Sequence, residues 1–111
     1  MKVIVFGATG SVGHLVVKEL LKAGHEATAF ARKPEKLGLT DANLFRTAGD
    51  ALDAKDVLEA VKGHDAAVIT LGSGFSRKSV IRSQGTMNVI RAMQAQGVKR
   101  LICQSTLGAR D

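Results

Sequence analysis

Apolar residues along this chain fall into short continuous runs that alternate with longer stretches of helical spacing. Runs such as 66–69 and 101–103 lack the every-second-residue pattern of a half-exposed strand, which indicates strands buried on both faces of a parallel sheet. Between the runs, apolar residues recur with the spacing of helices that pack against a sheet. The pattern predicts strands near residues 2–6, 26–31, 44–47, 66–71 and 99–104, and helices near 11–23, 54–62 and 77–96.

Glycine and proline residues support these boundaries. Gly24, Gly63 and Gly97 each follow a helical pattern at the position where glycine commonly ends a helix. Pro34 follows the second predicted strand, and we expect residues 34–42 to form a loop with at most one helical turn. Strands that alternate with helices in this way predict an α/β fold with a parallel sheet.

The first predicted strand leads into a turn that contains three glycines, followed by the first helical pattern. Gly7 allows the chain to leave the strand in a conformation closed to other residues, and Gly13 allows the helix to pack close to the strand. Gly10 allows phosphate groups to approach the main chain, and the unpaired N–H groups of a helix start favour an anion. The segment predicts a site for a dinucleotide pyrophosphate; the alternative is an ordinary strand-to-helix turn without a ligand.

A basic cluster follows the second predicted strand. Arg32, with Lys33 and Lys36 close behind, stands about 20 residues after the glycines, where NAD-binding units carry a carboxylate for the ribose hydroxyls. A guanidinium at this place can hold a 2′-phosphate in a forked arrangement, so the sequence predicts NADP(H) in preference to NAD(H). The alternative is that Arg32 is a solvated surface charge.

Composition bears on the number of domains, on membrane contact and on nucleic-acid binding. The 111 residues, with 45% hydrophobic and 4% aromatic content, predict one domain over 1–111. No charged leader with an apolar signal region and no run of membrane-spanning length is visible, so we expect a cytoplasmic protein without membrane contact. The net charge of +6 would suit nucleic acid, but the basic residues are scattered and lack interleaved aromatic side chains, which disfavours such a partner.

Six patches in one order make the chain resemble the N-terminal part of the atypical short-chain dehydrogenases, nearest to the NmrA-like and biliverdin-IXβ/flavin reductase type. The patches are residues 7–13, 31–32, 49–51, 71–73, 83–88 and 103–106. The resemblance implies a Rossmann-like doubly wound parallel sheet of about five strands in the order 3-2-1-4-5. It also implies that 1–111 is an NAD(P)-binding domain that is incomplete relative to the family, because the sequence stops after the fifth strand.

The resemblance also assigns contacts to the phosphate and adenine end of the cofactor. The residues that would line the pyrophosphate are Thr9, Gly10, Ser11 and Val12. Arg32 would meet the 2′-phosphate, with Lys36 beside it. Asp50 and Ala51 would border the adenine, whose exocyclic amine can donate to a carboxylate. The alternative for Asp50 is that it simply caps or turns the chain before Leu52.

The nicotinamide end would follow the fourth and fifth strands. Leu71, Gly72 and Ser73 would border the nicotinamide ribose, and Ser105 with Thr106 would face the nicotinamide. These patches fall at the carboxyl ends of predicted strands, where open α/β sheets bind their ligands. The alternative for residues 72–74 is a flexible loop without a ligand.

Candidate catalytic groups are few. The chain has no tyrosine, so the Tyr–Lys pair of typical short-chain dehydrogenases cannot operate in it. His14, His25 and His64 are expected at the surface and away from the nicotinamide, and one cysteine with three separated histidines gives no metal-ligand spacing. Ser105 and Thr106 are the candidates for orienting donors in a site where the cofactor supplies most of the chemistry.

Three functions are compatible with the sequence. The leading hypothesis is an NADPH-dependent oxidoreductase of flavin- or biliverdin-reductase-like type that transfers hydride to a small conjugated acceptor. The alternatives are a non-catalytic NmrA-like module that senses NADP(H) through a protein partner and a basic nucleic-acid binder. Because the fifth strand would be an apolar sheet edge, we also expect either a homo-oligomer formed through it or a longer protein of which this chain is a fragment.

Overall fold

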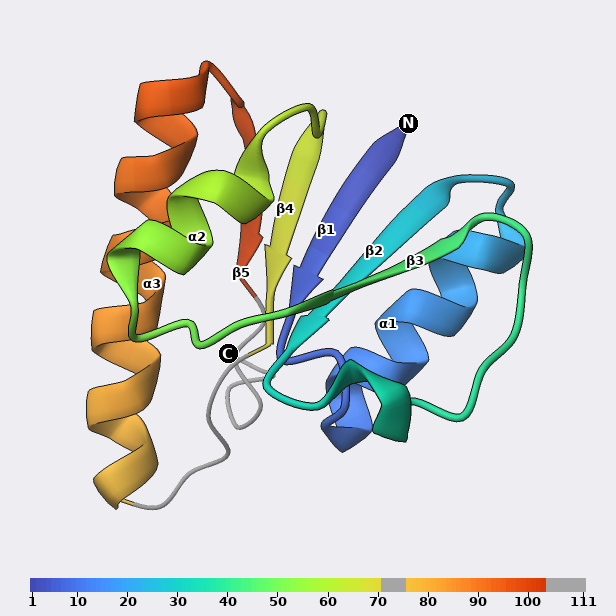
Figure 1. Cartoon of the computed structure of the whole chain (residues 1–111), viewed down its shortest axis with the longest axis horizontal. Coiled ribbons are helices and arrows are strands. Elements are labelled where there is room, and N and C mark those ends of the chain that lie inside the picture. Colours follow the sequence, from blue (N-terminus) through green and yellow to red (C-terminus); the bar gives the residue numbers. More distant parts are fainter. Residues whose placement is uncertain (71–75, 104–111) are drawn as a thin grey trace.

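Five parallel strands form one sheet with the order β3-β2-β1-β4-β5 (Figure 1). The computed structural model describes the backbone of residues 1–70 and 76–103. The strands are β1 (Lys2–Phe6), β2 (Glu26–Ala31), β3 (Leu44–Ala48), β4 (Ala66–Ile69) and β5 (Arg100–Cys103). The helices are α1 (Ser11–Lys22), α2 (Ala54–Val61), α3 (Ser76–Gln96) and a single 3-10 turn, η1 (Pro34–Lys36). The predicted fold class and strand order are confirmed.

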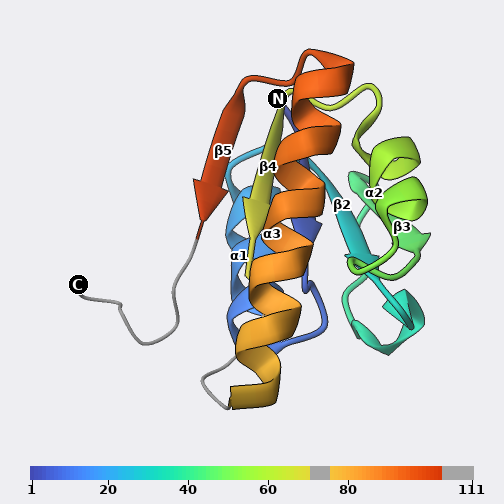
Figure 2. The ribbon, with the colours of Figure 1, turned by 90° about the vertical axis from the view of Figure 1, so that its left-hand side faces the viewer.

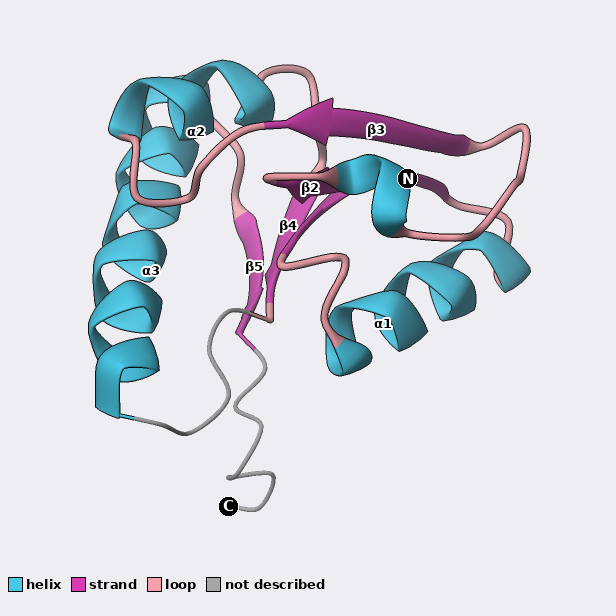
Figure 3. Cartoon of the chain, turned by 60° about the horizontal axis from the view of Figure 1, so that its bottom comes forward, coloured by secondary structure: helices cyan, strands magenta, loops and turns pink. Residues whose placement is uncertain are grey.

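Helices cover both faces of the sheet. Figures 2 and 3 show α1 on one face and α2 with α3 on the other. Consecutive residues of β1 alternate between the two sides: Ile4 joins the core under α2 and α3, whereas Val5 joins the core under α1. Both residues are fully buried, which explains why the central strands show no polar alternation in the sequence.

The predicted boundaries hold to within a residue or two. The fourth strand ends at Ile69, although the N–H of Thr70 still donates to the Phe6 carbonyl over 3.0 Å, and residue 71 lies outside the described part of the chain. The loop after β2 contains one short helical turn, as expected. The three helix-ending glycines all have positive φ values, between 73° and 87°.

The winding of the sheet reverses between β1 and β4. From β1 the chain proceeds outward through β2 to β3, and β4 then returns to the other side of β1 and leads to β5. Such a reversal leaves a crevice at the carboxyl ends of the two central strands, where open α/β sheets bind ligands. The start of α1 and the η1 turn both lie at this end of the sheet (Figure 1).

Candidate cofactor-binding site

Two of the three glycines in the β1–α1 turn are required by the fold itself. Gly7 has a φ of +84°, and a Cβ built on it would lie 2.8 Å from the hydroxyl oxygen of Thr70. A Cβ on Gly13 would lie only 2.1 Å from the carbonyl oxygen of Gly7, so α1 packs against the end of β1 as closely as main-chain atoms allow. Both geometric expectations for these positions are met.

Gly10 differs from the other two. Its φ of −76° is open to any residue, and a Cβ on it would meet the Gly7 carbonyl oxygen at an ordinary 3.4 Å. Neither backbone conformation nor internal packing therefore requires glycine here. As the N-cap residue of α1, Gly10 also brings no side chain to the first amides of the helix.

The start of α1 is suited to an anion. The Gly10 carbonyl accepts the first intrahelical hydrogen bond, from the N–H of His14 over 2.9 Å, so the amides of residues 11–13 precede the hydrogen-bonded ladder. The first turn contains no acidic residue. These amides and the helix dipole place partial positive charge at the end of β1. The Ser11 side chain lies outside the described part of the structure.

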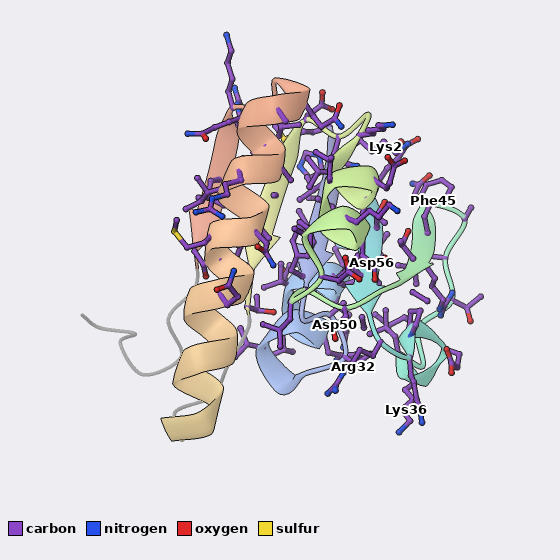
Figure 4. All side chains as sticks on the ribbon, turned by 60° about the vertical axis from the view of Figure 1, so that its left-hand side comes forward. Lys2, Arg32, Lys36, Phe45, Asp50 and Asp56 are labelled. Carbon is purple, nitrogen blue, oxygen red and sulfur yellow. The ribbon has the colours of Figure 1, made fainter. Side chains whose placement is uncertain are left out.

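An open pocket of about 390 Å³ adjoins this helix start. It is lined by Thr9 from the glycine turn and by Arg32, Lys33 and Lys36 from the loop after β2. The described lining thus contains three cations and no carboxylate. Figure 4 shows Arg32, Lys36 and Asp50 at the same end of the molecule. The structure therefore brings the predicted basic cluster to the predicted glycine turn.

The loop that carries Lys36 is held in place from both sides. Pro34 and Leu37 are buried, and Leu37 belongs to the core under α1. Arg46 of β3 donates from Nε to the Pro34 carbonyl oxygen over 3.3 Å and from Nη2 to the Leu39 carbonyl oxygen. Arg46 was not among the predicted site residues; the available signal was a basic residue in the middle of a predicted strand.

The predicted adenine-side residues lie in the loop between β3 and α2. Asp50 is exposed, and its Oδ1 accepts the N–H of Leu52 over 2.9 Å, which is the turn-forming role considered as its alternative. Ala51 is buried, and its carbonyl oxygen accepts from Nδ2 of Asn88 over 2.8 Å. Asn88, itself buried in α3, receives a hydrogen bond from Gln84. This polar chain ties the loop to α3.

A family model described as NAD(P)H-binding matches residues 7–111. This chain belongs to that NAD(P)H-binding family. The match confirms the expected resemblance to the NAD(P)-binding part of atypical, NmrA-like short-chain dehydrogenases. Within the family, a 3-diazoavenalumate denitrifying reductase from Streptomyces is 32% identical over 95% of this chain. The chain spans 38% of the length of that reductase, 31% of a 3-beta-hydroxysteroid dehydrogenase from Mycolicibacterium neoaurum and 53% of a protein from Saccharomyces cerevisiae.

Solved structures of this NAD(P)H-binding type have the same fold. An oxidoreductase from Lactococcus lactis is 28% identical with a TM-score of 0.81, and the match covers 98% of this chain and 50% of that protein. A uronate dehydrogenase variant from Agrobacterium tumefaciens in complex with NAD is 26% identical with a TM-score of 0.76, covering 94% and 40%. The three relatives described above are thus named as a reductase, an oxidoreductase and a dehydrogenase.

Residues 71–73, Ser105 and Thr106 lie outside the described residues. Their contacts with the nicotinamide end of the cofactor therefore stay a prediction from the sequence. Among the described residues, no group of three or more histidine, cysteine or acidic side chains is placed to hold a metal ion. No helix in the described part is both long and apolar enough to span a bilayer.

His64 departs from the expectation of a surface residue. It is half-buried in the α2–β4 turn, at the opposite end of the sheet from the pocket, with Nε2 2.8 Å from the hydroxyl oxygen of Thr28. Its Nδ1 lies 3.2 Å from the Val61 carbonyl oxygen and 3.1 Å from that of Lys62, so the ring is drawn inward to satisfy the end of α2. Burial lowers the pKa of His64 below its ordinary value.

Proposed function

We propose that this chain binds NADP(H) in preference to NAD(H) and forms the cofactor-binding part of an NADPH-dependent oxidoreductase. The observation that carries the proposal is the basic pocket lined by Thr9, Arg32, Lys33 and Lys36 beside the start of α1. The family match supports NAD(P)H as the ligand class, and the basic lining is the property that favours the phosphorylated form.

The pocket is chemically complementary to a 2′-phosphate. A phosphate monoester carries nearly two negative charges at neutral pH and three acceptor oxygens. The Arg32 guanidinium can meet two of these oxygens in a forked geometry, while the Lys33 and Lys36 ammonium groups act as mobile point charges. NAD(H) has a ribose hydroxyl in place of the 2′-phosphate. The three cations would therefore stay hydrated and would add little to the free energy of NAD(H) binding.

The glycine turn supplies the contact that both nucleotides share. A pyrophosphate approaching Gly10 meets main-chain atoms with no side chain from that residue in the way, and the dipole of α1 is directed at the same place. This accounts for glycine at the one turn position where neither the chain's conformation nor its packing calls for it. Asp50 and Ala51 would border the adenine, with Asp50 Oδ1 engaged in its own turn.

When bound, the cofactor supplies the hydride. The chain's residues bind and orient it: Leu71, Gly72 and Ser73 would border the nicotinamide ribose, and Ser105 and Thr106 would donate hydrogen bonds that fix the ring. A small conjugated acceptor suits this arrangement because such an acceptor can take up hydride without a protein nucleophile. The chain contains no tyrosine for the Tyr–Lys proton transfer of typical short-chain dehydrogenases.

Equilibrium titration with NADPH and NADH, followed by nicotinamide fluorescence, tests the proposal. We expect NADPH to bind at least about tenfold more tightly, the worth of one hydrogen bond to a charged group. Equal affinities would refute the NADP(H) preference, and no affinity for either nucleotide would refute the cofactor site. Loss of nicotinamide absorbance on addition of a flavin would support a reductase, whereas tight binding without turnover would favour a sensor that acts through a partner.

A further inference from the structure

The loop that brings Lys36 to the pocket has little internal support. Its regular part is the single 3-10 turn η1, in which the N–H of Lys36 donates to Lys33 over 3.0 Å and the N–H of Leu37 donates to Pro34 over 3.1 Å. Isolated helical turns of this length are not stable in water, because few hydrogen bonds offset the lost backbone entropy. The position of Lys36 therefore depends on contacts from outside the loop.

Arg46 provides such contacts at both ends of the loop. The Pro34 carbonyl oxygen accepts from Nε of Arg46 as well as from the N–H of Leu37, and the Leu39 carbonyl oxygen accepts from Nη2. Lys36 lies between these two carbonyl groups along the chain. Arg46 is itself fixed by its place in β3, where it is in register with Ala29 of β2.

A guanidinium is well suited to this task. Its N–H groups point in fixed directions from a rigid plane, so one side chain can donate to two separate carbonyl groups at once. Arg46 is not among the described residues that line the pocket, so its contribution there passes through the loop. Burial of Pro34 and Leu37 packs the loop against the core. Arg46 adds a second hydrogen bond to the Pro34 carbonyl oxygen, beside that from the N–H of Leu37, and a hydrogen bond to the Leu39 carbonyl oxygen.

We propose that Arg46 is a positioning residue for nucleotide selectivity: by holding the carbonyl groups of Pro34 and Leu39, it keeps Lys36 at the pocket for a 2′-phosphate. The inference rests on the proposed function. Without Arg46 the loop samples other arrangements, and part of the favourable binding free energy is lost to ordering Lys36 when the nucleotide binds. The pyrophosphate contacts at the glycine turn do not depend on this loop, so affinity for NADH is retained.

The test compares Arg46→Ala with Arg91→Ala, which removes an equal charge from an exposed position on α3, across the sheet. We expect Arg46→Ala to weaken NADPH binding about fivefold while NADH changes by less than about twofold. Arg91→Ala should leave the ratio of the two affinities unchanged. If Arg46→Ala does not fold, Arg46→Lys serves in its place, because an ammonium cannot reproduce the forked contacts and should also lower the ratio.

Two further measurements separate positioning from a general structural or electrostatic effect. If Arg46 acts through Lys36, the Arg46→Ala/Lys36→Ala double variant binds NADPH no more weakly than Lys36→Ala alone. The Leu37 amide should also exchange with solvent faster in Arg46→Ala, while amides of β1 keep their protection. Fully additive losses, or an unchanged affinity ratio in Arg46→Ala, would overturn the role of Arg46. A wild-type protein without NADPH preference would instead overturn the proposed function, whatever the exchange rates.

Discussion

Replacement of Gly10 by alanine separates cofactor binding from folding at the β1–α1 turn. The variant should fold, because a φ of −76° suits alanine and the new Cβ would lie at an ordinary 3.4 Å from the Gly7 carbonyl oxygen. Alanine is a poorer N-cap residue than glycine, which costs about 1 kcal/mol or less. A domain of this size then loses at most about 4 °C in Tm.

Nucleotide affinity should fall much further than stability. The added methyl group stands where we propose that the pyrophosphate meets the main chain. Loss of one charge-assisted hydrogen bond there costs about 1.5–3 kcal/mol, which corresponds to about a ten- to hundredfold weaker complex. NADPH and NADH should weaken alike, since both carry the pyrophosphate.

Gly13→Ala should lower stability, in contrast to Gly10→Ala, which should mainly lower nucleotide affinity. Its Cβ would lie 2.1 Å from the Gly7 carbonyl oxygen and 2.9 Å from the Ala8 Cα, so α1 must move away from β1. Overpacking of this kind costs about 1–3 kcal/mol or more, and the variant should lose stability before binding can be assessed. Gly63→Ala, strained by its φ of +78° but located at the far end of the sheet, should lower Tm without changing the affinity.

Thermal unfolding followed by circular dichroism measures the stability of all three variants, and titration with NADPH and with NADH measures their affinities. Wild-type affinity for both nucleotides in Gly10→Ala would show that the pyrophosphate does not lie on Gly10. Unfolding of Gly10→Ala to the extent of Gly13→Ala would refute the packing analysis of the turn.

Three other predictions concern Arg32, His64 and Asn88. Arg32→Ala should weaken NADPH binding about ten- to hundredfold with little change for NADH, and Arg91→Ala, titrated in parallel, should change neither affinity. His64 has a folded pKa below its ordinary value of 6.5, so the unfolded chain binds the proton first and the free energy of unfolding should decrease as the pH falls below 6.5. Urea unfolding at pH 7.5 and pH 5 should show this decrease, and His64→Gln should reduce it; an equal decrease in that variant would assign the effect to other groups. Asn88→Ala leaves the buried Ala51 carbonyl without its 2.8 Å donor and should cost about 1–3 kcal/mol in chemical denaturation, whereas Gln84→Ala, at an exposed position, should cost less.

The sequence was sufficient for the features that depend on local chemistry. The geometric roles of Gly7 and Gly13 could be predicted because few backbone conformations lead from a buried strand directly into a helix. The location of Arg32 at the end of the second strand could be predicted from its distance along the chain from the glycines. Apolar runs without polar alternation were enough to predict a parallel sheet with both faces covered.

The features that escaped prediction depend on contacts between distant residues. Arg46 binds main-chain carbonyl groups, which every residue carries, so no side-chain pattern marks its partners. His64 is drawn inward partly by Thr28, 36 positions away, and Asn88 meets Ala51 across 37 positions. Such pairings become apparent only once the sheet has placed its neighbouring elements.

The position of β3 at the edge of the sheet has a consequence for the nucleotide site. An edge strand is hydrogen-bonded to the sheet on one side, so it detaches locally at a lower free energy than the central strands. When β3 detaches, Arg46 withdraws from the loop, while β1, α1 and the glycine turn between them remain in place. Transient fraying of β3 would therefore reduce the preference for NADPH over NADH without releasing either nucleotide from the glycine turn.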